Sequence, residues 1–281
     1  MGARQSVVVV GATGATGRHV CAQLLQRGHR CTVGAPPPPP LPGQRRRPRR
    51  LTPAASPAGA HQAVARSKER LVDALEEVQP GLSQKRGLEV VHASLLDLSS
   101  EELAALVANA DAVVQCLGHN LTFRGLWLPP YLLVKTACER LTAAMAESGK
   151  PRAKFVLMGS DGAAHPGGED DPRSMGERAL LAVMRALLPP VRDNEAAAAY
   201  MHGLGMKSGL EWTVLRPTDM KNGEAQPYSL YPKPVGGLFG DGIVTRATVA
   251  ACMVDLITNR KLWKQHAGRF PVVHDVEAGA S

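Results

Sequence analysis

Three glycines near the start of the chain have the spacing of a phosphate-binding turn. Gly11, Gly14 and Gly17 follow directly on the run Val7 to Val10, and a helical pattern of apolar residues comes after them. In a strand–turn–helix of this kind, the first glycine permits a tight turn. The second lets the backbone approach a pyrophosphate, and the third lets the helix sit close to the strand. The helix N-terminus then presents N–H groups and a partial positive charge to the phosphates, so the stretch predicts a dinucleotide site.

The residues after the second predicted strand indicate which dinucleotide is bound. In the common NAD version, an acid at the end of this strand bonds to the ribose hydroxyls, but here the strand ends in Gly34-Ala35. Further along stand Arg66, Ser67 and Lys68, and a guanidinium beside an ammonium suits a 2′-phosphate. We therefore expect NADP(H) rather than NAD(H). The alternative is that Arg66 and Lys68 are solvated residues in the first turn of a helix.

Other side chains that could carry chemistry lie in loops. Ser160 and Asp161 stand near His165, but they share one loop and lack the Gly-x-Ser-x-Gly of a nucleophile elbow. Ser160 is therefore expected to line the cofactor cleft and is the candidate catalytic residue. His119 could donate a hydrogen bond to a substrate or a phosphate, but a loop histidine is more often solvated. Asp193 is expected to cap the alanine-rich helix that follows it.

The acid pair Asp170-Asp171 is flanked by a proline and is expected to belong to a turn. Five cysteines are scattered without a Cys-x-x-Cys and without Cys/His pairs at metal spacing. They are expected to be buried free thiols, and no metal site is expected.

The elements that must position these residues alternate between apolar β-branched runs and helical patterns. This alternation builds right-handed βαβ crossovers and a parallel sheet. We therefore expect one α/β domain over residues 1–281, a doubly wound (Rossmann) fold with the cofactor at the carboxyl ends of the strands. The expected strands span residues 6–10, 30–33, 88–92, 112–117, 154–158, 211–215 and 270–273. The expected helices span residues 14–26, 68–78, 100–108, 130–147, 174–187, 194–206 and 246–259.

Residues 34–64 do not fit this alternation. They are rich in proline and contain a run of arginines from Arg45 to Arg50. With few large apolar residues, the segment is expected to be a disordered insertion after the second strand. The arginine run could be a nuclear-localisation or nucleic-acid patch, or could attract phosphates. The lack of nearby aromatics favours a solvated low-complexity insert, so nucleic acid is not the expected partner.

The bulk composition excludes several classes of protein. Hydrophobic residues make up 44% of the 281 residues, which is enough for a core. Aromatic residues make up only 4%, which is too few to favour base stacking. No apolar run is long enough to span a bilayer. The first strand begins near Ser6, which leaves no room for a presequence. We therefore expect a cytoplasmic protein, with an organelle as the alternative.

Motifs at successive strand ends carry a family resemblance. They are Gly11-x-x-Gly14-x-x-Gly17, Arg66-Ser67-Lys68, Ser94-Leu95-Leu96-Asp97, Cys116-Leu117-Gly118, Gly159-Ser160-Asp161 and Leu215-Arg216-Pro217-Thr218. Together they resemble the atypical short-chain dehydrogenases/reductases, in particular the NAD(P)-binding NmrA-like group that includes flavin/biliverdin reductase-like proteins. The resemblance covers the chain except the insertion. The glycine and Arg-Pro motifs are fairly specific to the superfamily, but neither is specific to a reaction.

The resemblance implies a cofactor-binding role at each strand end. The implied pyrophosphate contacts are Gly11, Thr13, Gly14, Ala15, Thr16 and Gly17, and the implied 2′-phosphate contacts are Arg66, Ser67 and Lys68. Ser94 and Leu95 would lie near the adenine, although the family often has an acid where Ser94 stands. Leu117 and Gly118 would border the nicotinamide ribose. Ser160 would sit near the nicotinamide, with Pro217 and Thr218 on its carboxamide side.

The catalytic Tyr-x-x-x-Lys of tyrosine-dependent members is missing from its proper place. Tyr131 and Lys135 have the spacing, but they precede the fifth strand, whereas the active pair follows it, so the match is interpreted as accidental. On the helix where the pair belongs, Tyr200 has Leu204 four residues on, and Lys207 is seven residues on.

Two classes of function remain. The first is a reductase for a small conjugated acceptor such as a flavin or quinone, because cofactor geometry alone can suffice for hydride transfer. The second is a non-catalytic NADP(H)-binding regulator or assembly factor. Nucleic-acid binding through the arginine run is a third and weaker hypothesis. Residues 223–242, which lack regular periodicity, are expected to contact the substrate or a partner.

Overall fold

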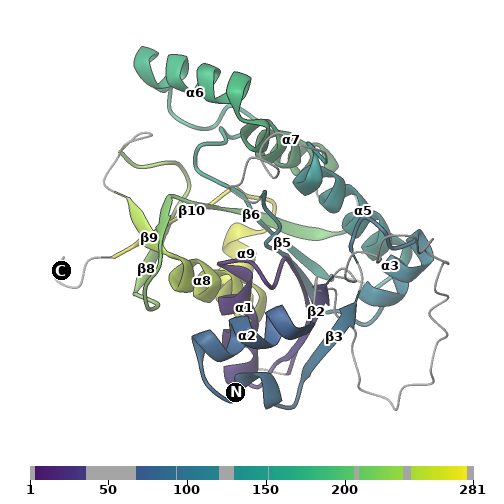
Figure 1. The fold of residues 1–281 in the computed structure, drawn as a ribbon. Coiled ribbons are helices and arrows are strands. Elements are labelled where there is room, and N and C mark those ends of the chain that lie inside the picture. The colour runs from purple at the N-terminus through teal and green to yellow at the C-terminus, as the bar shows by residue number, and fades with distance from the viewer. Residues whose placement is uncertain are drawn as a thin grey trace, which may run out of the picture.

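A twisted sheet forms the centre of the computed structural model, which describes residues 4–35, 68–92, 94–119, 130–150, 152–205, 209–236 and 242–276. Eight strands follow the order β3-β2-β1-β4-β5-β6-β10-β8 (Figure 1). Neighbouring strands are parallel, except that β8 runs antiparallel to β10. The strands are β1 (Ser6–Val10), β2 (Arg30–Ala35), β3 (Leu88–His92), β4 (Ala112–Gln115), β5 (Lys154–Met158), β6 (Glu211–Pro217), β8 (Tyr228–Tyr231) and β10 (Val272–Asp275). A separate short pair joins β7 (Asp219–Lys221) to β9 (Ile243–Thr245).

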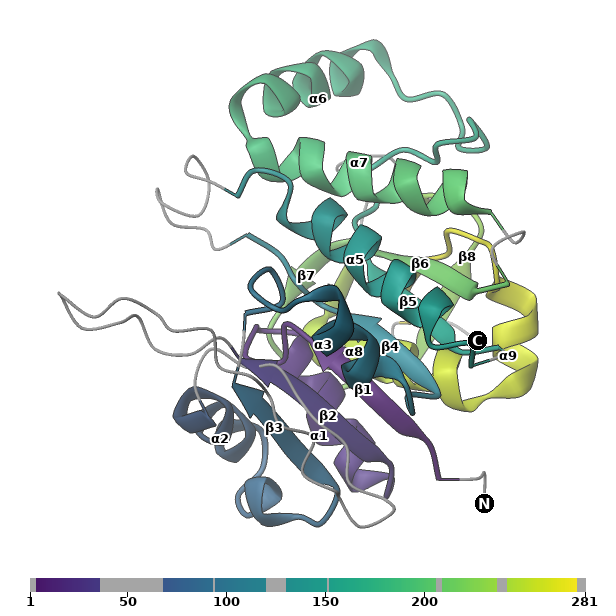
Figure 2. The same cartoon turned by 90° about the vertical axis from the view of Figure 1, so that its right-hand side faces the viewer.

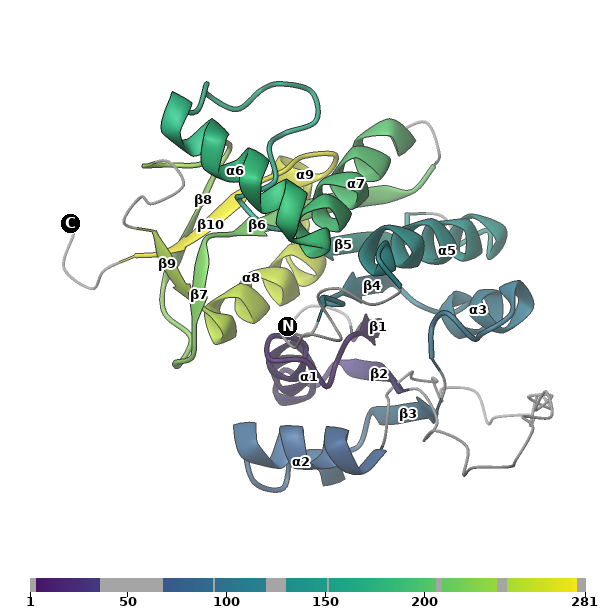
Figure 3. The same ribbon diagram turned by 45° about the horizontal axis from the view of Figure 1, so that its top comes forward.

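Helices cover both faces of the sheet, as Figure 3 shows. One layer contains α1 (Gly17–Gln26), α2 (Lys68–Val78), α8 (Arg246–Thr258) and α9 (Arg260–His266). The opposite layer contains α3 (Ser100–Val107), α5 (Leu133–Glu147) and α7 (Pro189–Leu204). The helix α6 (Met175–Leu187) packs beside α7 and stands away from the sheet (Figure 2). A short 3-10 helix, η1 (Leu82–Gln84), precedes β3.

The valine run explains why β1 lies at the centre. Val7 and Val9 belong to the apolar cluster beneath α1 and α8, whereas Val8 and Val10 belong to the cluster beneath α5. Successive side chains of a strand point to opposite faces, so an uninterrupted β-branched run suits a strand that is buried on both. The predicted doubly wound fold is therefore confirmed.

Several predicted helix starts are also confirmed. Ser99 accepts a hydrogen bond from the N–H of Glu102, whose side chain accepts one from the N–H of Ser99, so α3 begins with a capping box. Ser174 and Glu177 make the same reciprocal pair at the start of α6. These bonds satisfy N–H groups that the helix itself leaves unpaired.

Differences from the prediction concentrate at element ends. α7 begins at Pro189, five residues before the expected start, because prolines are favoured in the first helical turn. The segment 223–242, expected to lack regular structure, supplies the edge strand β8. Gly34 and Ala35 belong to β2 rather than to the insertion, and residues 36–64 lie outside the described residues.

Two further expectations concern burial. All five cysteines are buried and free, as predicted. Within the part of the chain that the structure describes, every helix is too short or too polar to cross a membrane.

Candidate functional site

The first glycine of the turn packs against the loop that follows β4. Gly11 has a φ of +82°, a conformation that side chains rarely adopt. A Cβ added there would lie 2.6 Å from the carbonyl carbon and oxygen of Cys116 and 2.7 Å from the amide nitrogen of Leu117. Only glycine therefore lets the turn pack against the loop after β4. β4 is the neighbour of β1 in the sheet, and the order of the strands reverses between these two.

The other two glycines close the turn and bring the helix to it. The N–H of Gly14 donates to the carbonyl oxygen of Gly11 at 2.9 Å. A Cβ on Gly17 would overlap that carbonyl oxygen and lie 2.8 Å from the carbonyl carbon of Gly11. The start of α1 therefore sits directly on the turn, with no side chain between them.

The N-terminus of α1 has no side-chain cap. Thr16 occupies the N-cap but makes no capping hydrogen bond, and the first turn contains no acid. The hydroxyl of Thr16 instead lies 3.9 Å from the Sδ of Met220 on β7. An uncapped helix start behind a turn whose glycines let the backbone come close is a cradle for a diphosphate. The residues present therefore fit the dinucleotide that the sequence predicts.

Two further strand ends meet beside this cradle. The N–H of Asp161 donates to the carbonyl oxygen of Pro217 at 3.1 Å, which ties the loop after β5 to the end of β6. The Oγ of Ser160 accepts a hydrogen bond from the N–H of Gly162 at 3.2 Å. Thr218 is 8% exposed, and its hydroxyl has no hydrogen-bond partner among the residues that the structure describes. Buried polar groups are nearly always paired, so this hydroxyl is available to a polar group of a ligand at the strand ends.

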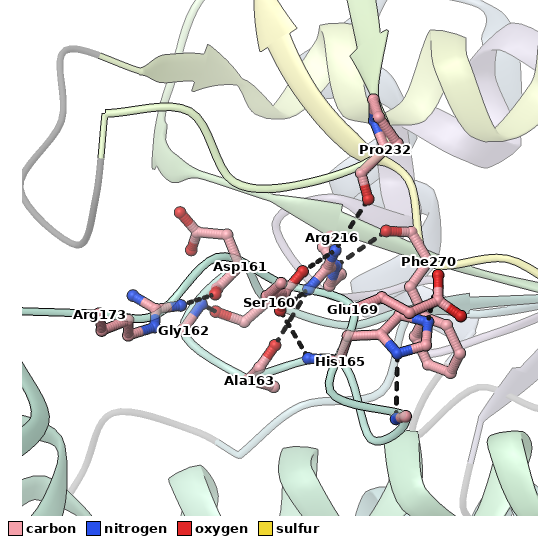
Figure 4. A network of polar contacts seen from close by, with 12 residues as sticks. Ser160, Asp161, Gly162, Ala163, His165, Glu169, Arg173, Arg216, Pro232 and Phe270 are labelled. Carbon is pink, nitrogen blue, oxygen red and sulfur yellow. Dashed lines mark hydrogen bonds and ion pairs between the residues drawn. The ribbon is translucent and has the colours of Figure 1, made fainter.

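A buried arginine holds this corner together (Figure 4). Arg216 on β6 is 1% exposed and makes a bidentate pair with Asp170 at 2.7 and 3.0 Å. Its Nε donates to the carbonyl oxygen of Phe270 at 2.9 Å, just before β10. The backbone N–H of His165 donates to the same carboxylate at 2.6 Å. Arg216 therefore fixes the loop after β5 against β6 and β10.

The carboxylate in this network has an altered pKa. Burial by itself would raise the pKa of Asp170, but the hydrogen bonds from Arg216 and from the backbone N–H of His165 outweigh it. The pKa of Asp170 therefore lies below its ordinary value, and the carboxylate stays charged. Asp170 lies in a loop, as expected of a turn residue, and it is also the partner of a buried cation.

The model of a family of NAD(P)H-binding domains matches residues 44–260, most of the chain. The chain belongs to this NAD(P)H-binding family. The match begins after the glycine turn, so the geometry of the turn is separate evidence for the same class of ligand. The resemblance to atypical short-chain dehydrogenases/reductases agrees with this assignment. Among curated proteins, no sequence is significantly similar.

Solved structures share the fold at low sequence identity. A protein from Lactobacillus casei is 20% identical with a TM-score of 0.63, covering 97% of this chain and 100% of its own. A short-chain dehydrogenase/reductase from Veillonella parvula, solved in complex with NADP, is 18% identical with a TM-score of 0.59, covering 98% and 96%. A provisionally assigned NADH-flavin reductase from Streptococcus pneumoniae is 15% identical with a TM-score of 0.60, covering 97% and 100%. These likenesses establish the fold that the NAD(P)H-binding family shares.

The remaining predicted contacts of this NAD(P)H-binding chain are distributed as follows. Ser94 begins the turn after β3, where its carbonyl oxygen accepts from the N–H of Asp97 at 2.9 Å, and Leu95 beside it is buried. Gly118 faces open space. Lys68 is the first residue of α2. Arg66 and Ser67 lie outside the described residues, so the predicted 2′-phosphate contacts stay a prediction.

Two expectations about loop and helix residues are wrong. His119 is not solvated: its side chain is 6% exposed, and Nε2 lies 2.7 Å from a carboxylate oxygen of Asp193. Asp193 lies inside α7 and does not cap it. Its carboxylate accepts from the N–H groups of Val134 and Lys135 at 2.7 and 2.9 Å. It therefore caps α5, a helix far away in sequence.

The residues with Tyr-x-x-x-Lys spacing have other roles in the structure. Tyr131 is exposed just before α5, and Lys135 forms an ion pair with Glu139 one turn along at 2.6 Å. The hydroxyl of Tyr200 bonds to the hydroxyl of Thr142 on α5 at 2.7 Å. Lys207 lies outside the described residues.

We expect that Tyr131→Phe and Lys135→Met leave both NADPH affinity and any turnover within about twofold. The lysine change removes only a solvent-exposed ion pair one helical turn apart, and such pairs contribute little to stability. Fluorescence titration with NADPH and a steady-state assay of each variant measure this. A tenfold loss of turnover in Tyr131→Phe, with binding intact, would restore this pair as catalytic.

Proposed function

We propose that the chain is an NADP(H)-dependent reductase of a small conjugated acceptor such as a flavin or a quinone. The observation that carries the proposal is the cradle formed by Gly11, Gly17 and the uncapped start of α1. It lies at the carboxyl end of β1, beside the ends of β4, β5 and β6, where open α/β sheets bind their ligands. The name of the Streptococcus pneumoniae structure, with the same fold, supports a flavin-type acceptor.

The protein's residues have defined tasks in this reading. When bound, the reduced cofactor supplies a hydride. The glycine turn and the N–H groups of α1 hold the diphosphate, and the buried hydroxyl of Thr218 offers a hydrogen bond to the carboxamide. Ser160 borders the place where the acceptor would lie. The network around Arg216 keeps these strand ends in register, as hydride transfer requires close and fixed geometry.

The preference for the phosphorylated cofactor rests on charge. β2 ends in Gly34-Ala35 and offers no carboxylate to the ribose hydroxyls. Arg66 and Lys68 come next in the chain after the insertion, and both are suited to a 2′-phosphate. The structure of the Veillonella parvula protein with NADP supports this choice for the fold.

We expect NADPH to bind about tenfold or more tightly than NADH, a difference of about 1.4 kcal/mol. Replacing Arg66 with alanine should remove most of this preference, because a guanidinium–phosphate pair is charge-assisted. Parallel titrations of the wild type and of Arg66→Ala with both nucleotides measure it. Equal affinity of the wild type for the two nucleotides would contradict the NADP(H) assignment.

A second candidate is a non-catalytic NADP(H)-binding regulator. Two observations favour it: the hydroxyl of Tyr200 bonds to Thr142, and no lysine stands four residues after this tyrosine. NADPH oxidation with a panel of quinones, flavins and aldehydes separates the two functions. The reductase predicts turnover with at least one planar acceptor. Tight NADPH binding without turnover of any acceptor would favour the regulator.

A further inference from the structure

One carboxyl group at the strand ends lacks the partner that the other buried acids have. The carboxylate of Asp170 pairs with Arg216, and that of Asp193 accepts from His119 and two backbone N–H groups. The carboxylate of Asp161 is partly buried but forms no ion pair with another described residue. In Figure 4 it points away from Arg216, while Arg173 donates to its backbone carbonyl oxygen at 2.5 Å.

The surroundings of Asp161 favour its protonated form. Burial raises the pKa of Asp161, and the carboxylate of Asp219 raises it further. Arg173, the N–H of Gly162 and Arg216 act in the opposite direction but do not cancel the rise. A carboxyl group with a raised pKa at the edge of a cofactor site is suited to hold and deliver a proton.

The position of Asp161 is fixed by the sheet. Its N–H is bonded to the carbonyl oxygen of Pro217, so it stands beside Thr218 at the end of the neighbouring strand. Ser160 precedes it, and the Ser160 oxygen accepts from Gly162, which leaves the hydroxyl hydrogen able to donate elsewhere. The hydrogen-bonded ends of β5 and β6 therefore carry a hydroxyl donor, a carboxyl group and the hydroxyl of Thr218, which has no partner among the described residues.

We propose that Asp161 is the proton donor of the reductase, with Ser160 donating a hydrogen bond to the carbonyl oxygen of the acceptor. This inference rests on the proposed function. The acceptor takes a hydride, with its two electrons, from the reduced nicotinamide and becomes an oxyanion. The carboxyl group of Asp161 transfers its proton to that oxygen and becomes a carboxylate. A proton from solvent restores the acid, so each cycle consumes one hydride and one proton and yields the reduced, neutral acceptor.

The test uses the full chain, NADPH and a water-soluble naphthoquinone. Asp161→Asn should lower kcat by about 100-fold or more, the range of general acid catalysis, with NADPH affinity unchanged within threefold. Asp161→Glu should recover part of the rate. The Tm of Asp161→Asn should equal or exceed that of the wild type, because a neutral amide avoids the penalty on a buried charge.

The pH dependence separates proton transfer from a structural role. Wild-type kcat should fall as pH rises through the pKa of Asp161, because the donor loses its proton. The kcat of Asp161→Asn should not show this fall with rising pH. Asp219→Asn is the matched control. Its kcat at acidic pH should equal that of the wild type, but kcat should begin to fall at a lower pH, because the Asp219 carboxylate that raises the pKa of Asp161 is gone.

Each other result overturns the inference. If Asp161→Asn keeps wild-type kcat, Asp161 is not the donor, although the reductase function stands. If Asp161→Asn loses NADPH binding together with turnover, the residue serves the cofactor and not the proton. If kcat of Asp219→Asn falls at the same pH as in the wild type, the fall does not reflect the titration of Asp161. If the wild type binds NADPH but reduces no acceptor, the reductase function itself fails and the proton donor fails with it.

Discussion

Gly11→Ala is expected to weaken NADPH binding by about 100-fold or more, which corresponds to ~2.7 kcal/mol. The added methyl group would lie 2.6 Å from the backbone of Cys116, well inside van der Waals contact, and backbone cannot rotate away as a side chain can. The turn and the loop after β4 must therefore move apart. That movement displaces the N–H groups that we propose to hold the diphosphate. Fluorescence titration with NADPH measures the loss.

Gly28→Ala is the matched control for the backbone conformation. Gly28 has a φ of +78°, close to the +82° of Gly11, but a Cβ there would meet nothing within 4 Å. Both variants pay the conformational penalty of roughly 1 kcal/mol, whereas only Gly11→Ala adds the overlap. NADPH affinity within threefold of wild type is expected for Gly28→Ala. Equal losses in the two variants would show that stability, and not the cradle, controls binding.

The second large effect concerns stability: Arg216→Met should lower the free energy of unfolding by about 3–5 kcal/mol. Methionine roughly preserves the volume but leaves the carboxylate of Asp170, whose side chain is 10% exposed, without its cation. The carbonyl oxygen of Phe270 also loses a donor. Urea unfolding at pH 7 measures the change.

Lys233→Met is the control, because it breaks a second ion pair of the same length in the same region. Lys233 and Asp171 also lie 2.7 Å apart, but their side chains are 45% and 74% exposed. Exposed pairs contribute roughly 0–1 kcal/mol, so little change is expected. A loss as large as that of Arg216→Met would mean that burial does not distinguish the two pairs.

The pH dependence of the arginine variant follows from the lowered pKa of Asp170. In the wild type, this group contributes stability above the unfolded-state pKa, about 4, and that contribution is lost as pH falls through the folded-state pKa. In Arg216→Met, the buried carboxylate is unfavourable at pH 7 and is relieved by protonation. The difference between wild type and variant should therefore shrink when unfolding is repeated near pH 4.

Local patterns in the sequence predicted the parts of the fold that local physics determines. The valine run of β1 and the start of α3 at Ser100 depend on residues within a few positions of one another. The glycine spacing predicted the cradle because each glycine is required at a position of the turn where a side chain would clash. Element ends were predicted less well, since α7 starts at a proline that could equally have ended the preceding helix.

The tertiary partners could not be predicted in the same way. Arg216 and Asp170 are 46 residues apart, and nothing near either residue identifies the other. One signal was available, because an arginine within the apolar strand Glu211–Pro217 requires a buried acid. Asp161 had no such signal: its partial burial and the nearby carboxylate of Asp219 arise only when β5, β6 and β7 assemble.

The cap that Asp193 places on α5 has a consequence for how the chain reaches its native state. The carboxylate and the N–H of Val134 are 59 residues apart, so the first turn of α5 gains its acceptor only after α7 has docked. Closing such a long loop is slow compared with forming a helical turn. The two helices should therefore acquire their final order as one cooperative unit.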